Sequence, residues 1–214
     1  MVIAIDGPAG AGKSTVARAL ARRLGATYLD SGAMYRCIAL AALRSGIDLA
    51  KGEELARLAR RLKIELTDDR VRLDQEDVTE AIRDPAVSAA ASRVSTHPGV
   101  REAMVERQRA LMAAGDYVVE GRDIGTVVSP DSPLKVFLTA SEDERARRRA
   151  AEIGEPADEV MEAQASRDAR DRGRKHGALQ AAADAVEIDT TGLDVAGVVQ
   201  RIVTLARERG LTRG

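Results

Sequence analysis

The N-terminal end of the chain contains the pattern that most restricts how it can fold. Residues 7–14 read GPAGAGKS and match G-x-x-x-x-G-K-[ST] at every fixed position. The apolar run at 2–5 predicts a buried strand before this loop, and apolar residues at helical spacing from Val16 to Leu24 predict a helix after it. Strand, glycine-rich loop and helix in this order predict a phosphate-binding loop, rather than a turn that only joins two elements.

The residues of this loop predict a site for a nucleoside triphosphate. Glycines let the backbone wrap around an anion, and the N-terminus of the following helix adds a positive dipole end. Lys13 supplies a charge for the β- and γ-phosphates, and the Ser14 hydroxyl is a ligand for the Mg²⁺ that accompanies them. We therefore expect the triphosphate to contact Gly7, Pro8, Ala9, Gly10, Ala11, Gly12, Lys13, Ser14 and Thr15.

Four further apolar runs predict strands at 27–29, 117–119, 135–138 and 186–188. Helical patterns separate these runs, so the chain alternates strands and helices as in an α/β fold with a five-stranded parallel sheet. Right-handed crossovers place the loops that follow the strands at the carboxyl edge of the sheet, where ligands bind in such folds.

A long excursion with elements of its own lies between the second and third of these strands. Residues 53–62, 85–95 and 98–114 show helical patterns, and residues 64–73 alternate as in a small polar hairpin. The excursion is too structured for a disordered loop and too small for an independent domain. We interpret it as an inserted lobe, in a place suited to holding a second substrate.

Composition narrows the classes of partner and compartment. Lys and Arg total 33 and Asp and Glu total 34, so no overall field favours nucleic acid or an anionic membrane. Three tyrosines and one phenylalanine leave few rings for stacking on bases. The single cysteine, Cys37, can form no intrachain disulfide, and no apolar stretch is long enough to span a bilayer. We expect a cytoplasmic protein with Cys37 as a core residue and no transition-metal cluster.

Clusters of arginine and aspartate stand where a phosphate-bearing acceptor would need them. Guanidinium groups grip phosphate oxygens in pairs and stay charged in a closed site. The pair Arg122-Asp123 directly follows a predicted strand, which favours a functional role. The run 167–174 (RDARDRGR) can equally be a solvated helix face with charge pairs three and four residues apart, and 145–149 can be surface charge.

With these motifs and their spacing, the chain resembles the bacterial cytidylate kinases, which are nucleoside monophosphate kinases of the P-loop class. The resemblance extends from about residue 2 to about residue 208. The segments GRDIGT and DSGAMYR are specific to this family, whereas the phosphate-binding loop alone is not. The resemblance is carried by AIDGPAGAGKST at 4–15, LDSGAMYR at 29–36, VRE at 100–102, GRDIGTVV at 121–128 and RDARDRGR at 167–174.

The resemblance implies a single domain with the three-layer α/β/α fold of P-loop NTPases. Its core would comprise about 1–30, 115–144 and 176–214, with a lobe for the nucleoside monophosphate at about 31–114 and a short lid at about 145–175. The hairpin, near 64–79, would be the family's insertion in a shortened form.

The resemblance also implies which residues hold CMP, and they come from four segments. They are Ser31, Tyr35 and Arg36; Arg101, which would read cytosine; Arg122 and Asp123, which would touch phosphate and base; and Arg167 and Asp171 at the ribose with Arg174 at the nucleotide.

The implied reaction is transfer of a phosphoryl group from ATP to CMP or dCMP, with Mg²⁺, in pyrimidine nucleotide metabolism. Lys13, Arg122 and Arg148 would be catalytic, and Arg145 and Arg149 of the lid would also close over the phosphates. A phosphate acceptor is largely ionised at neutral pH, so no general base is required. The expected protein is a monomer with small-molecule substrates and neither nucleic acid nor membrane as partner.

Two other functions remain open from the residues. Another small-molecule P-loop kinase, such as a UMP/CMP kinase of the adenylate kinase type or a shikimate kinase, would share the loop but not GRDIGT and RDARDRGR. A P-loop switch would need a residue to orient water, and no glutamine stands near the loops after the second and third strands. Nucleic-acid binding is disfavoured by the charge balance.

Overall fold

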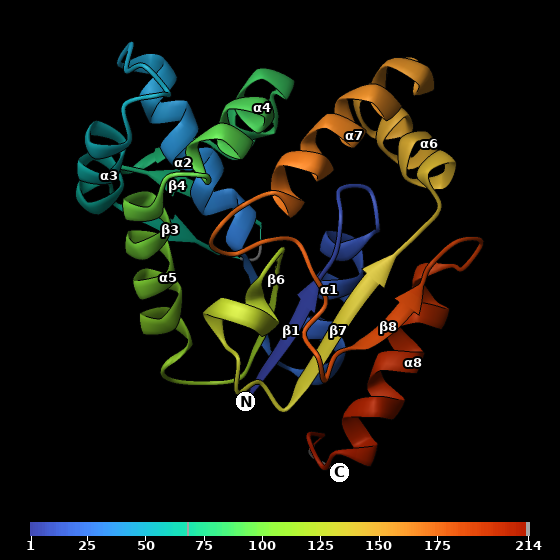
Figure 1. The fold of residues 1–214 in the computed structure, drawn as a ribbon. Coiled ribbons are helices and arrows are strands. Elements are labelled where there is room, and N and C mark those ends of the chain that lie inside the picture. The colour runs from blue at the N-terminus through green and yellow to red at the C-terminus, as the bar shows by residue number, and fades with distance from the viewer. Residues whose placement is uncertain (68, 213–214) are drawn as a thin grey trace. The chain divides into compact units, whose positions relative to one another are not determined.

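The computed structural model describes residues 1–67 and 69–212 (Figure 1). Asp68, in the turn of the expected hairpin, lies outside the described residues, as do residues 213–214. The chain forms two compact units, the first made of 1–28 with 115–214 and the second of 29–114.

A five-stranded sheet organises the first unit. Its strand order is β2-β6-β1-β7-β8, and β1 pairs in parallel with both β6 and β7, as β7 does with β8. The register sets Asp6, the last residue of β1, beside Gly121 of β6 and Phe137 of β7. The predicted α/β fold with five parallel strands is confirmed. The strands are β1 (Val2–Asp6), β2 (Thr27–Asp30), β6 (Tyr117–Gly121), β7 (Leu134–Thr139) and β8 (Val186–Asp189).

The core of the first unit lies between this sheet and two helices, α1 (Lys13–Leu24) and α8 (Val195–Glu208). The central strands are apolar almost throughout because both faces of a parallel sheet are covered. Leu20 of α1 and Ile202 of α8 are fully buried against the strands. Each such side chain contributes about 1.5–3 kcal/mol on burial. The first strand and its loop are therefore held on a rigid base.

Three further helices of the first unit follow β6 and β7. A short π-helix, η2 (Ile124–Val128), follows β6, and α6 (Glu142–Ile153) and α7 (Ala157–Arg172) follow β7. The α6 helix begins after Ser141, whose hydroxyl accepts a hydrogen bond from the Glu144 N–H. Figure 1 shows α6 and α7 packed side by side as a helical hairpin, in the stretch for which the resemblance implied a lid.

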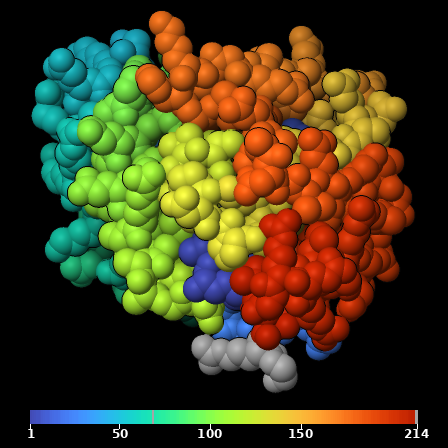
Figure 2. All heavy atoms as spheres, turned by 60° about the horizontal axis from the view of Figure 1, so that its bottom comes forward, coloured from blue at the N-terminus to red at the C-terminus, as the bar shows by residue number. Residues whose placement is uncertain are grey.

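Arg209, directly after α8, connects the C-terminal helix to the segment that precedes β7. In Figure 2 the residues at the C-terminal end, in red, lie beside the yellow segment near residue 133. Arg209 donates a hydrogen bond to the Pro133 carbonyl oxygen at 2.7 Å. No helix in the described part of the chain combines the length and the apolar character needed to cross a membrane.

The second unit is helical with a small antiparallel sheet. The sheet has three strands in the order β3-β4-β5, so the predicted hairpin acquires a third strand. Cys37 is fully buried in its core, as predicted, and burial raises the pKa of its thiol to about 12. The elements are α2 (Ser31–Arg44), α3 (Gly52–Arg61), β3 (Ile64–Leu66), β4 (Val71–Leu73), β5 (Glu76–Asp77), the 3₁₀ helix η1 (Ala81–Arg83), α4 (Pro85–Val94) and α5 (Pro98–Met112).

Candidate active site

The loop between β1 and α1 has the backbone shape that its glycines predict. Gly7, Gly10 and Gly12 have φ values of 149°, 76° and 85°, which side chains rarely allow. A Cβ on Gly7 would lie 2.2 Å from the Leu138 carbonyl oxygen, so only glycine fits where the loop leaves β1. The loop therefore begins tightly against β7 and ends at the N-terminus of α1.

Lys13 is buried inside this loop. Its Nζ donates a hydrogen bond to the Pro8 carbonyl oxygen at 2.7 Å. Burial, and after it the positive charge of Arg122, lowers the pKa of Lys13 to about 7. Arg167 acts in the same direction. A phosphate in the loop would favour the charged form of Lys13, so the site is built to receive negative charge.

Ser14 lies beside a carboxylate that the sequence reasoning missed. Its hydroxyl donates to Glu120 Oε2 at 3.0 Å, and the Tyr28 hydroxyl donates to Glu120 Oε1. Glu120 stands near the end of β6 and is buried. Its signal in the sequence is a charged residue directly after the apolar pair Val118-Val119.

The Ser14 hydroxyl and the Glu120 carboxylate are the kinds of oxygen ligand that Mg²⁺ takes. Within residues 1–67 and 69–212, no group of three or more His, Cys, Asp or Glu side chains could hold a metal by itself. The two oxygen ligands of Ser14 and Glu120 fit an ion such as Mg²⁺, which commonly takes its other ligands from phosphates and water.

Arg122 and Arg174, predicted from separate motifs, meet on one carboxylate. Arg122 Nε donates to Asp171 Oδ2 at 3.1 Å, and Arg174 Nη2 donates to Asp171 Oδ1. Burial works to raise the pKa of Asp171, but the charges of Arg122, Arg174 and Arg167 outweigh it and hold the pKa below its ordinary value. Asp171 is therefore ionised and forms ion pairs with two guanidinium groups, those of Arg122 and Arg174. Asp123, next to Arg122, is also buried.

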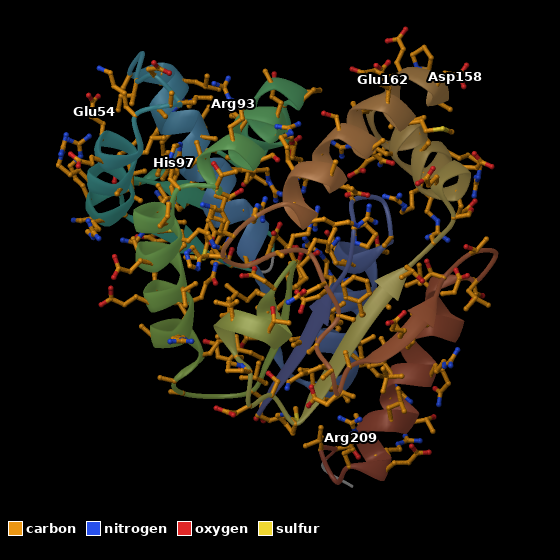
Figure 3. All side chains as sticks on the ribbon, in the orientation of Figure 1. Glu54, Arg93, His97, Asp158, Glu162 and Arg209 are labelled. Carbon is orange, nitrogen blue, oxygen red and sulfur yellow. The ribbon has the colours of Figure 1, made fainter. Side chains whose placement is uncertain are left out.

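The sequence of 167–174 left two alternatives open, part of a binding site or a solvated helix face, and the structure shows one buried and one exposed face. Asp168 and Asp171 are each only 1 % exposed, whereas Arg170 and Arg172 are exposed. Nearer the N-terminus of α7, Asp158 and Glu162 are exposed and extend outward in Figure 3. One face of the end of α7 therefore belongs to the candidate site, and the opposite face is solvated.

Asp168, also missed from the sequence, fastens α6 and α7 to the tip of the loop. Its Oδ1 accepts a hydrogen bond from the Ala9 N–H at 3.4 Å, and its Oδ2 pairs with Arg145. Arg145 also donates to the Ala9 carbonyl oxygen at 3.1 Å. A Cβ on Gly10 would lie 2.7 Å from the Arg145 carbonyl oxygen. Arg145 is thus a buried anchor of the loop in this structure.

The other two arginines expected to close over the phosphates differ in position. Arg148 donates to the Thr190 hydroxyl and carbonyl oxygens at 2.9 and 2.7 Å, and the Thr190 hydroxyl donates to the Ala11 carbonyl oxygen. Arg148 therefore lies next to the loop. Arg149 instead pairs with Glu152 one turn along α6, at 2.8 Å.

The second unit carries the remaining predicted residues, Ser31, Tyr35, Arg36 and Arg101. Asp30 caps α2 by accepting from the Ala33 N–H at 2.9 Å, and its other oxygen accepts from Arg36 Nη2 at 2.7 Å. Ser31 and Arg101 are buried, at 4 % and 5 % exposure. The residue that caps α2 thus also holds the guanidinium group of Arg36, in the second turn of the helix.

The sequence is similar to those of known proteins over most of its length. The family model described as "Cytidylate kinase" matches residues 3–208. A cytidylate kinase of Pelotomaculum thermopropionicum is 53 % identical and aligns over 94 % of this chain and 93 % of its own length. One of Desulfitobacterium hafniense is 51 % identical, over 97 % and 93 %.

Among solved structures, a shikimate kinase from Bacteroides thetaiotaomicron matches with a TM-score of 0.51 at 17 % identity. The match covers 97 % of this chain and 98 % of that one. At this identity the likeness supports the fold alone.

Proposed function

Because the chain belongs to the cytidylate kinase family, we propose that it transfers the γ-phosphoryl group of ATP to CMP, and also to dCMP, giving ADP and CDP or dCDP. It is a phosphotransferase of pyrimidine nucleotides. The further details, namely ATP as donor, dCMP as second acceptor, Mg²⁺ and the roles of individual residues, are part of the proposal.

One observation in the first unit supports this reaction most strongly. The charges of Arg122 and Arg167, from segments far apart in the sequence, both act on Lys13, against the opposite charges of Glu120 and Asp168. Asp171 in turn ties Arg122 to Arg174. Phosphoryl transfer needs little covalent chemistry from the protein; it needs aligned reactants and neutralisation of charge at the migrating group. Cationic groups gathered in this way would neutralise charge at the migrating phosphoryl group.

For the donor, we assign the triphosphate to the loop. Its backbone amides would surround the β-phosphate, and Lys13 would leave the Pro8 carbonyl to contact the β- and γ-phosphates. Arg148, held beside the loop by Thr190, and Arg122 would contact the migrating group.

Ser14 and Glu120 would hold Mg²⁺ together with phosphate oxygens. When bound, the ion would neutralise part of the negative charge of the phosphates. In this structure the Ser14 hydroxyl is already oriented by Glu120, so little reorganisation of these two residues is needed.

For the acceptor, we assign the phosphate and base of CMP to the arginine-rich segments. Arg36 is held in place by Asp30, and Arg122 and Arg174 by Asp171. Holding the acceptor in line with the donor is worth an effective concentration on the order of 10⁵ M or more. The full set proposed for CMP is Ser31, Tyr35, Arg36, Arg101, Arg122, Asp123, Arg167, Asp171 and Arg174.

A panel of acceptors tests the proposal. ADP release, followed with a coupled assay, is measured with CMP, dCMP, UMP and AMP at equal concentrations. We expect rapid turnover with CMP and dCMP. A strong preference for AMP would overturn the acceptor assignment, and slow hydrolysis unaffected by any monophosphate would favour a P-loop switch. We further propose that the protein acts as a monomer in the cytoplasm, which its sedimentation behaviour and cell fractionation would check.

A further inference from the structure

Asp6 is a buried carboxylate that has no role in the donor and acceptor sites proposed above. It is the last residue of β1, directly before Gly7, and is 5 % exposed. Within the described residues 1–67 and 69–212, no ion pair within 4.0 Å includes Asp6. A buried charge without a salt-bridge partner is costly, so its hydrogen bonds must be specific and complete.

Both oxygens of Asp6 accept hydrogen bonds from successive backbone amides of η2. Oδ1 accepts from the Ile124 N–H and Oδ2 from the Gly125 N–H, each at 2.8 Å. These amides open the π-helix, and its own N-cap residue, Asp123, makes no capping hydrogen bond through its side chain. The helix is therefore capped by a residue 118 positions earlier in the chain.

The opposite side of this contact is closed by Lys135. A Cβ on Gly125 would lie 3.2 Å from Lys135 Cδ and 3.4 Å from Asp6 Oδ2. The Lys135 ammonium itself points to Asp184, to which it donates at 2.8 and 2.9 Å. Gly125 thus fits between the Asp6 carboxylate and the aliphatic part of Lys135.

From this geometry we infer that Asp6 is a positioning residue for the acceptor: it fixes the backbone of Arg122 and Asp123 relative to the phosphate-binding loop. Ile124 directly follows Asp123, and Gly7 directly follows Asp6, so one carboxylate joins the two segments that would hold acceptor and donor. The inference rests on the proposed function, because it takes Arg122 and Asp123 as acceptor contacts.

The variant Asp6→Asn tests the inference, because an amide nitrogen would face one of the two N–H donors. We expect the KM for CMP to rise about tenfold or more, as befits hydrogen bonds to a charged group, with the Kd for ATP within about twofold. Asp194→Asn is the matched control, since Asp194 also caps a helix, α8, by accepting from the Gly197 N–H at 2.8 Å. It should leave both constants unchanged.

Local exchange of amide hydrogens supplies a readout that is independent of activity. In Asp6→Asn, the peptide spanning 122–128 should exchange at least about tenfold faster, and in Asp194→Asn it should exchange as in the natural protein. If Asp6→Asn does not fold, Gly125→Ala disturbs the same contact from the other side, and it should raise the KM for CMP more than the Kd for ATP.

Results that contradict the inference differ from results that contradict the proposed function. Equal changes for ATP and CMP, or unchanged constants with unchanged exchange, would overturn the inference, as would a loss of activity that only follows a loss of folded protein. If the natural protein does not phosphorylate CMP, the proposed function fails, while the exchange experiment still decides whether Asp6 holds residues 122–128.

Discussion

The guanidinium group of Arg122 donates through Nε to the carboxylate of Asp171, with 3.1 Å between Nε and Oδ2. The first residue follows β6, and the second lies in the last turn of α7, 49 positions later. Arg174 uses the other oxygen of the same carboxylate. Asp171 therefore determines where two of the proposed phosphate contacts stand.

Replacing Asp171 by Asn should impair use of CMP and leave ATP binding intact. Hydrogen bonds to charged groups contribute about 1.5–3 kcal/mol, which corresponds to roughly a tenfold to hundredfold rise in the KM for CMP. Steady-state kinetics with each nucleotide varied separately measure both effects. The control is Asp158→Asn, an exposed carboxylate on the same helix (Figure 3). Equal losses for both nucleotides would remove Asp171 from the acceptor site.

Lys13→Met should nearly abolish turnover, because the charge that would contact the β- and γ-phosphates is lost. Removing one donor to a developing charge typically lowers kcat by about 10²–10³. The thermal midpoint should not fall, because burial disfavours the charged form of Lys13 in the native state and lowers its pKa. Calorimetry with an activity assay checks both, and exposed Lys175→Met serves as control. Near-normal turnover would contradict the assignment.

Breaking the buried pair of Arg145 and Asp168 should destabilise the protein. Removing one partner of a buried ion pair costs about 3–5 kcal/mol. For a chain of this length, Asp168→Asn should therefore lower Tm by roughly 6–20 °C. Thermal unfolding followed by circular dichroism measures the change. Arg149→Met breaks a more exposed pair with Glu152 and should cost no more than about 1 kcal/mol. Similar Tm changes for both variants would exclude an anchoring role for Arg145.

Burial should make the contribution of Asp6 to stability depend on pH. Burial raises the pKa of Asp6 from 3.8 to about 6. The hydrogen bonds from Gly125 and Ile124 act against this rise; among the charged groups, Asp123 raises the pKa further and Lys13 lowers it. The folded state thus binds this proton more tightly than the unfolded state. The stabilisation that comes from binding this proton is therefore fully present below pH 3.8, and it is lost as pH rises through 6.

The measurement is the free energy of unfolding of the natural protein minus that of Asp6→Asn, from urea titrations between pH 4 and 7. We expect this difference to fall by up to about 3 kcal/mol across that range, at about 1.4 kcal/mol per pKa unit. A difference that does not change with pH would contradict the raised pKa of Asp6.

Arg101→Ala should reduce discrimination between cytosine and uracil. We expect the ratio of kcat/KM for CMP to that for UMP to fall, because a buried guanidinium group would no longer read the base edge. Arg93→Ala, exposed on α4 and labelled in Figure 3, is the control in the same unit. An unchanged preference for cytosine would reject the role of Arg101.

The sheet, the phosphate-binding loop and the family could be predicted from the sequence because each depends on short-range patterns. The family resemblance predicted from the motifs is confirmed. Glu120 and Asp168 were missed because their roles come from partners 106 and 159 residues away, Ser14 and Ala9. A single charged residue at the end of an apolar run or inside a charged helix can mark a candidate, but it does not identify a partner so far away in the chain.

Two local structures also had no signal in the sequence. Strand β5 consists of Glu76 and Asp77, two exposed residues that form a strand only because they pair with β4. The π-helix at 124–128 is capped by Asp6, far away in the chain. The divisions of the chain into core, lobe and lid, and the roles of individual site residues, stay predictions.

The central claim is that the γ-phosphoryl group of ATP passes to CMP. Its most direct test follows ATP labelled in the γ-phosphate, with CMP and Mg²⁺, and separates the products by chromatography. We predict that the label appears in CDP at the rate at which ADP forms. Label released as inorganic phosphate at that rate, with no labelled CDP, would contradict the claim.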